Sequence, residues 1–111
     1  MYKRQLWISG DTVLYDGVRQ VADRLDVDVA ILHLGGARFT VTGPVRYTMG
    51  ARDGITLIRE LAPRVVVPVH YEGWSHFRDG RDAIEAELAA APREVADRFR
   101  ILPIGVPTTI D

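Results

Sequence analysis

The sequence predicts an α/β domain, with a mainly parallel sheet and its helices on one face. Apolar runs of strand length alternate along the chain with longer segments in which apolar residues recur at helical spacing. Two of the runs, 29–32 and 65–69, are apolar at successive positions, which is typical of buried parallel strands. The length of 111 residues is that of one domain.

The first third of the chain contains two expected strands with a helix between them. Residues 6–9 form a short strand, which a turn signal at 10–12 ends. A helical pattern begins at Tyr15, and residues 28–34 form the second strand. The apolar face of the helix consists of Leu14, Val18, Val21, Ala22 and Leu25.

The rest of the chain continues the alternation. Residues 37–50 form an irregular loop, and loops of that length often carry functional sites. Pro63 is expected to end the next helix, because the residue before a proline disfavours helical geometry. The expected elements are a helix at 51–62, a strand at 65–69, a helix at about 80–91, a helical turn up to Phe99 and a strand at 100–104.

The resulting order, β-α-β-α-β-α-β, predicts where polar residues meet. Alternating strands and helices favour a parallel sheet with right-handed crossovers, in which all strands end at the same edge. Ligands of open α/β sheets bind at that edge. The residues expected to gather there are Asp11, His33, Gly35, Gly36, His70 and Gly105.

Composition excludes several classes of function. The formal net charge is −1 and the arginines are scattered singly, so we expect no nucleic-acid partner. Cysteine is absent, which excludes disulfides, thiolate ligands and a cysteine nucleophile. No apolar run approaches the ~20 residues of a membrane span, and no signal peptide is visible, so the expected location is the cytoplasm. Residues 1–5 hold the only lysine and are interpreted as a start foreign to the domain, which comprises 6–111.

Asp11 and His70 are the candidate metal ligands. Each follows an apolar strand, and the two strands are expected to end at one edge of the sheet. A carboxylate and a neutral imidazole are typical ligands of zinc and related divalent ions. A catalytic zinc takes three protein ligands, so this pair alone is an incomplete site. Asp11 could instead form only a turn or a helix cap.

Five further residues are candidates for a substrate pocket. His33 lies at a strand end, where it is expected to be a partly buried histidine rather than a ligand. His76 follows a glycine turn and either packs against the sheet or faces substrate, and Trp74 is core or pocket wall. Thr48 and Met49 precede a helix, where they either cap and pack or lie near the substrate.

Four segments together resemble the C-terminal half of a metallo-β-lactamase-fold hydrolase. Within that group the chain is most similar to the branch with L-ascorbate-6-phosphate lactonase-like and phospholipase D-like members. No single segment is decisive, but their order and spacing are specific, and the resemblance covers most of residues 6–107. The segments are ISGDT at 8–12, LHLGG at 32–36, YTM at 47–49 and PVHYEGWSHF at 68–77.

This resemblance implies an αββα sandwich of two similar halves with a dinuclear metal site at its edge. The metals are usually zinc and sometimes manganese or iron. Asp11 matches the aspartate that bridges the two metals, and His70 matches the last histidine ligand of the second metal. In such enzymes a metal-bound hydroxide attacks a small-molecule ester, lactone or phosphodiester.

The chain departs from the family pattern in its histidines. The family signature His-x-His-x-Asp-His belongs to the N-terminal half, whereas this chain has three histidines, none separated from another by one residue. The expectation is therefore that the chain alone is inactive and binds metal weakly. One sheet face would also lack its cover, which predicts either dependence on the missing N-terminal half or self-association.

Three other interpretations are weaker. In a non-catalytic α/β structural or interaction module, Asp11 and His70 would be turn residues only. A phosphorylated-aspartate domain needs a lysine near the acyl phosphate, but Lys3 lies outside the strand pattern. A Rossmann-type phosphate site needs a glycine-rich loop that opens a helix, whereas a long loop follows the glycines at 35–36.

Overall fold

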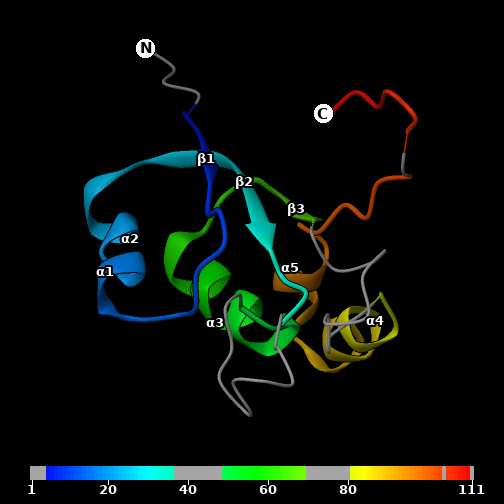
Figure 1. Cartoon of the computed structure of the whole chain (residues 1–111), viewed down its shortest axis with the longest axis horizontal. Helices are drawn as coiled ribbons and strands as arrows, with labels where there is room; N and C mark the ends of the chain where they lie inside the picture. Colours follow the sequence, from blue (N-terminus) through cyan, green and yellow to red (C-terminus); the bar gives the residue numbers. More distant parts are fainter. Residues whose placement is uncertain (1–4, 37–48, 70–80, 104, 111) are drawn as a thin grey trace, which may run out of the picture.

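The predicted α/β fold is confirmed: the chain forms a three-stranded parallel sheet with its helices packed against one face (Figure 1). The structure is a computed structural model, which describes residues 5–36, 49–69, 81–103 and 105–110. In the sheet β2 is the central strand, between β1 and β3. The strands are β1 (Gln5–Ile8), β2 (Val27–His33) and β3 (Val65–Val69).

The helices cover one face of the sheet: α1 and α2 connect β1 to β2, α3 connects β2 to β3, and α4 and α5 follow β3. The longest, α3, contacts each of the other helices. It lies over the sheet, with α1 and α2 at one side and α4 and α5 at the other (Figure 1). The helices are α1 (Asp16–Arg19), α2 (Val21–Arg24), α3 (Ala51–Leu61), α4 (Arg81–Ala90) and α5 (Arg93–Ala96).

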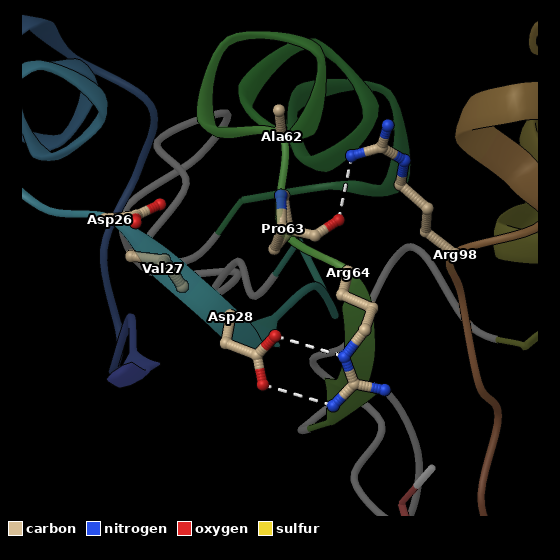
Figure 2. A pocket seen from close by; sticks show the side chains of 7 residues that line it. All are labelled: Asp26, Val27, Asp28, Ala62, Pro63, Arg64 and Arg98. Carbon is tan, nitrogen blue, oxygen red and sulfur yellow. Dashed lines mark hydrogen bonds and ion pairs between the residues drawn. The ribbon is translucent and has the colours of Figure 1, made fainter. Parts of the chain in front are cut away.

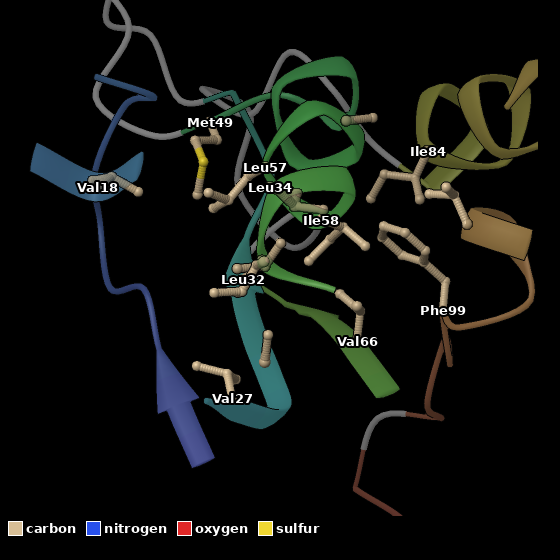
Figure 3. Packing of buried hydrophobic residues seen from close by; sticks show 14 residues of the cluster. Val18, Val27, Leu32, Leu34, Met49, Leu57, Ile58, Val66, Ile84 and Phe99 are labelled. Atoms are coloured by element: carbon tan, nitrogen blue, oxygen red, sulfur yellow. The ribbon is translucent and has the colours of Figure 1, made fainter. Parts of the chain in front are cut away.

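One apolar core fills the space between the sheet and the helices (Figure 3). Leu32 of β2 and Leu57 of α3 are fully buried in it, and a side chain of that size contributes about 1.5–3 kcal/mol on burial. The core consists of Val18, Val27, Ala30, Leu32, Leu34, Met49, Ala51, Leu57, Ile58, Leu61, Val66, Ile84, Val95 and Phe99.

Local contacts and backbone geometry explain where α3 begins and where it ends. At the start, the carboxylate of Asp53 lies 3.5 Å from the amide nitrogen of Gly50, in the geometry of half a capping box. At the end, Ala62 adopts a left-handed conformation with φ of +50° and donates its N–H to the Ile58 carbonyl at 2.8 Å. Pro63 follows, as the sequence predicts, and the chain turns directly into β3.

Two expected elements differ in the structure. The helix expected from Tyr15 is divided at Gln20 into two single turns, α1 and α2. The described part of the strand expected at 100–104 is not a strand: next to β3 there is one bridge, between Phe99 and Val66, and the Arg100 amide donates to the Val66 carbonyl at 2.8 Å. Pro103 cannot donate a ladder hydrogen bond, which disfavours extension of the pairing.

The other face of the sheet carries apolar side chains, and none of the helices in the described residues covers it. We call it the open face and define it as Leu6, Ile8, Val29, Ile31 and Val67. Leu6 is 60% exposed and Ile8 is 56% exposed, whereas Val29 and Ile31 are half-buried. In the ranges that the structure describes, no helix has the length and apolar character that a membrane span requires.

Candidate functional site

The carboxyl ends of the three strands meet at one edge of the sheet, as the sequence predicts. All pairings are parallel, with Ile8 opposite Ile31 and His33 opposite Val69. Asp11 follows β1 at this edge, and His33 ends β2 there. The chain therefore brings a carboxylate and an imidazole from separate segments to the same side of the domain.

Ser9 ties the ends of β1 and β2 together. Its amide donates a hydrogen bond to the Ile31 carbonyl at 2.9 Å, which continues the sheet ladder by one residue. Its hydroxyl accepts a hydrogen bond from the His33 amide at 3.0 Å and donates one to the Gly10 carbonyl at 3.1 Å. The sequence reasoning missed this role, although a hydroxyl residue at the end of an apolar strand was its signal.

A glycine turn then leads to Asp11. Gly10 has a φ of +66°, a conformation that residues with a Cβ atom rarely adopt, and nothing lies within 4 Å of the position a Cβ would take. The need for glycine here is therefore a matter of backbone conformation and not of space. Asp11 is exposed to solvent, as a carboxylate must be if it is to meet an incoming ligand.

His33 is half-buried at the end of the central strand, as the sequence predicts. Its neighbour Leu32 points into the core with no exposed surface, so alternation along the strand places His33 on the open face, beyond Ile31. The imidazole therefore lies where the open face meets the site edge.

The segment after β2 returns close to the start of α3. The Leu34 amide donates to the Val69 carbonyl at 3.1 Å, and the Gly36 amide donates to the Met49 carbonyl at 3.0 Å. Met49 has no exposed surface and belongs to the core, so its side chain packs beneath this edge.

Four of the candidate residues from the sequence lie outside the described residues: Thr48, His70, Trp74 and His76. His70 directly follows Val69, the last residue of β3. Within the described ranges, no group of three or more histidine, cysteine, aspartate or glutamate side chains is placed to hold a metal ion. Asp11 and His33 offer suitable donor atoms, but not a complete ligand set.

A hollow of about 480 Å³ lies at the opposite edge of the sheet, where β2 and β3 begin (Figure 2). Two of its charged side chains pair with each other: the Arg64 guanidinium donates to both carboxylate oxygens of Asp28, at 3.0 and 3.1 Å. Arg98 donates to the Pro63 carbonyl at 2.8 Å. These contacts join the strand starts to the end of α3, and we interpret the hollow as structural.

Curated relatives of the chain are metal-dependent hydrolases. It is 32% identical over 85 residues to a UPF0173 metal-dependent hydrolase of Pyrobaculum arsenaticum, a match of 77% of this chain and 34% of that protein. It is 30% identical over 99 residues to one of Methanospirillum hungatei, covering 89% of this chain and 39% of the relative. The chain thus spans little more than a third of the length of these relatives. No known family profile matches it.

Solved hydrolase structures share the fold. An isothiocyanate hydrolase from Delia radicum gut bacteria matches with a TM-score of 0.81 at 20% identity, over 96% of this chain and 40% of that protein. The metallo hydrolase Igni18 of Ignicoccus hospitalis matches with a TM-score of 0.69 at 23% identity, over 95% and 41%. The chain is therefore related to metal-dependent hydrolases over part of their length and has the corresponding part of a metallo-hydrolase fold.

Proposed function

We propose that the chain is the C-terminal half of a metallo-β-lactamase-fold hydrolase, in the branch of the L-ascorbate-6-phosphate lactonase-like proteins. The observation that supports this proposal is the shared edge of the sheet, at which the three parallel strands end: Asp11 follows β1 by three residues, and β3 ends directly before His70. The relatedness to metal-dependent hydrolases supports the same conclusion.

The proposed roles follow the family pattern. Asp11 would bridge two metal ions and His70 would bind the second. Ser9 would hold the backbone that presents Asp11, because its hydroxyl joins Gly10 to the end of β2. The substrate pocket would include His33, Thr48, Met49, Trp74 and His76.

Two divalent ions, zinc or alternatively manganese or iron, would supply the Lewis acidity that activates water and stabilises developing negative charge. The proposed substrate is a small molecule with an ester, lactone or phosphodiester bond. The chain alone would be inactive and bind metal weakly, because the remaining ligands belong to the missing N-terminal half.

A graft tests this proposal. The chain replaces the matched region of the Pyrobaculum arsenaticum relative, and zinc content and hydrolysis of phosphodiesters, esters and lactones are measured for the graft and for the chain alone. The graft should bind zinc and turn over at least one substrate. Asp11→Asn should remove most of both signals, whereas the control Asp26→Asn, an exposed aspartate at the opposite edge, should leave them unchanged.

Zinc content is the readout that does not depend on guessing the substrate. Equal zinc binding by the graft and its Asp11→Asn variant would contradict the proposed role of Asp11. Zinc-dependent turnover by the 111-residue chain alone would contradict the proposal that it is half of a site.

A further inference from the structure

We propose that Ser9 is a positioning residue for the metal site, because its hydroxyl couples the segment that carries Asp11 to the end of β3 through the end of β2. The hydrogen bonds that make up this coupling belong to the described residues. That the coupled segments carry metal ligands rests on the proposed function.

The Ser9 hydroxyl takes over a hydrogen bond that a regular strand makes with its main chain. The Ser9 amide donates to the Ile31 carbonyl at 2.9 Å, so in a regular parallel ladder the Ser9 carbonyl would accept from the His33 amide. That amide donates instead to the Ser9 hydroxyl at 3.0 Å, and the hydroxyl donates to the Gly10 carbonyl at 3.1 Å. The side chain thereby keeps β1 attached to β2 while the main chain turns at Gly10 toward Asp11.

The next amide along the chain holds the end of the third strand. The Leu34 amide donates to the Val69 carbonyl at 3.1 Å, and Val69 is the last residue of β3 and precedes His70 in the sequence. The amides of successive residues in a sheet point to opposite sides, so His33 bonds to the β1 segment and Leu34 to β3. Two consecutive residues thus connect the two segments in which the candidate ligands lie.

The end of β2 is a firm support for these two contacts. The Leu34 side chain has no exposed surface, and its Cδ2 atom lies 2.7 Å from the position that a Cβ of Gly54 in α3 would take. On the β1 side, packing contributes little, since Asp11 is exposed and nothing lies within 4 Å of a Cβ placed at Gly10. The position of Asp11 therefore depends on the Ser9 hydroxyl more than on packing.

A ligand that bridges two ions must lie at a fixed distance from both. Residues that orient metal ligands without touching the metal change metal affinity by about 10–100-fold when they are replaced. Loss of the Ser9 hydroxyl leaves both candidate ligands in the chain but frees the turn that carries Asp11. The expected result is weaker metal binding with an unchanged set of ligands.

The test measures zinc affinity in the graft of the chain into the Pyrobaculum arsenaticum relative, by competition with a chelator. Ser9→Ala should raise the zinc dissociation constant by about 10–100-fold. Ser9→Thr keeps a hydroxyl on the same carbon atom and should recover most of this loss. With Co²⁺ in place of zinc, Ser9→Ala should also change the visible absorption spectrum, which depends on the coordination geometry of the ion.

Two controls separate positioning from a general loss of stability. Thr12→Ala removes the hydroxyl of the residue after Asp11, which donates to the carbonyl of its own neighbour, Val13, at 3.0 Å. Ile84→Val removes a methyl group from the core at α4 and lowers stability without changing the edge of the sheet. Each control should change the zinc dissociation constant by less than about twofold.

The coupling itself is measured in the 111-residue chain without metal. Ser9→Ala should speed hydrogen exchange at the Leu34 amide as well as at the His33 amide, and more than Ile84→Val does. Faster exchange at His33 with unchanged exchange at Leu34 would refute the coupling of the Asp11 segment to β3.

The zinc measurements decide whether this coupling positions a metal ligand. Zinc affinity that depends on Asp11 but not on the Ser9 hydroxyl would overturn the inference and leave the proposed function standing. A loss in Ser9→Ala that Ile84→Val matches, or that Ser9→Thr does not recover, would overturn it in the same way. A graft that binds no zinc would contradict both the proposed function and the positioning role.

Discussion

Gly54 of α3 lies directly against Leu34, the residue that follows β2, and Gly54→Ala measures how rigid that contact is. A Cβ at this position would lie 2.7 Å from Cδ2 and 3.0 Å from Cδ1 of Leu34, closer than carbon atoms pack. Leu34 has no exposed surface, so its methyl groups cannot move away into solvent. Because Leu34 directly follows β2, this contact also sets the position of α3 relative to the candidate site.

Two effects of opposite sign decide the outcome. Alanine in place of glycine inside a helix stabilises it by about 1 kcal/mol. Forcing an extra methyl group into a packed core costs about 1–3 kcal/mol. The net expectation is a loss of about 1 kcal/mol in the free energy of unfolding. With a urea m-value of about 1–2 kcal/mol/M, the midpoint should fall by about 0.5–1 M with an unchanged slope.

A double-mutant cycle identifies the cause. In a Leu34→Ala background the crowding is gone, so Gly54→Ala should become stabilising by up to about 1 kcal/mol. Thr56→Ala, on the exposed side of the same helix, is the control because it changes helix propensity without approaching the sheet. If Gly54→Ala stabilises the otherwise unchanged protein, the close packing of α3 on Leu34 is refuted.

Three further substitutions follow from single contacts. Ser9→Ala removes the acceptor of the His33 amide and should cost about 1–3 kcal/mol, with faster hydrogen exchange at that amide; unchanged exchange would refute the contact. Ala62→Gly removes the Cβ from a residue with left-handed geometry, so the free energy of unfolding should rise by about 0.5–1 kcal/mol and the urea midpoint with it. A lower free energy of unfolding would show that the αL geometry carries no strain. The hydrogen bonds from Arg19 lower the pKa of Glu60 below its usual 4.5, so this pair stabilises the fold above that pH and the contribution disappears as pH falls through the lowered pKa. An NMR titration of Glu60 should show its pKa rising in Arg19→Gln, and an unchanged value would exclude the pair as the cause.

Elements with a single dominant local signal were predictable. The β-branched run at 65–69 lies between Pro63 and a glycine turn, and β3 has the predicted bounds. The helix expected at 51–62 appears as Ala51–Leu61. It was predictable because the helical spacing of its apolar residues and Pro63 after its end indicate the same bounds. Ala62, which the predicted bounds include, lies just past the last helical turn and is exposed.

Elements that depend on neighbours were harder to predict. The segment from Tyr15 has a helical pattern, but it includes Gly17, over which the Tyr15 ring packs, and the helix is interrupted at Gln20. The final strand needs a neighbour to pair with along its length, and among the described residues of this segment the bridge to β3 is made by Phe99, just before the expected strand begins. Pairing partners distant in sequence leave no local signal, so propensity alone overestimated both elements.

The sequence by itself determined the alternation of strands and helices, and therefore the parallel sheet and the common edge at which its strands end. Parallel strands joined by short crossovers can end only on one side, so this conclusion needed no coordinates. Tertiary structure alone decided which apolar residues remain exposed. Leu6 and Ile8 are of the same residue types as buried strand residues, so the sequence does not distinguish them. It also decided that the Ser9 hydroxyl joins two strands 24 positions apart, since hydrogen-bond partners are chosen by proximity in the folded chain.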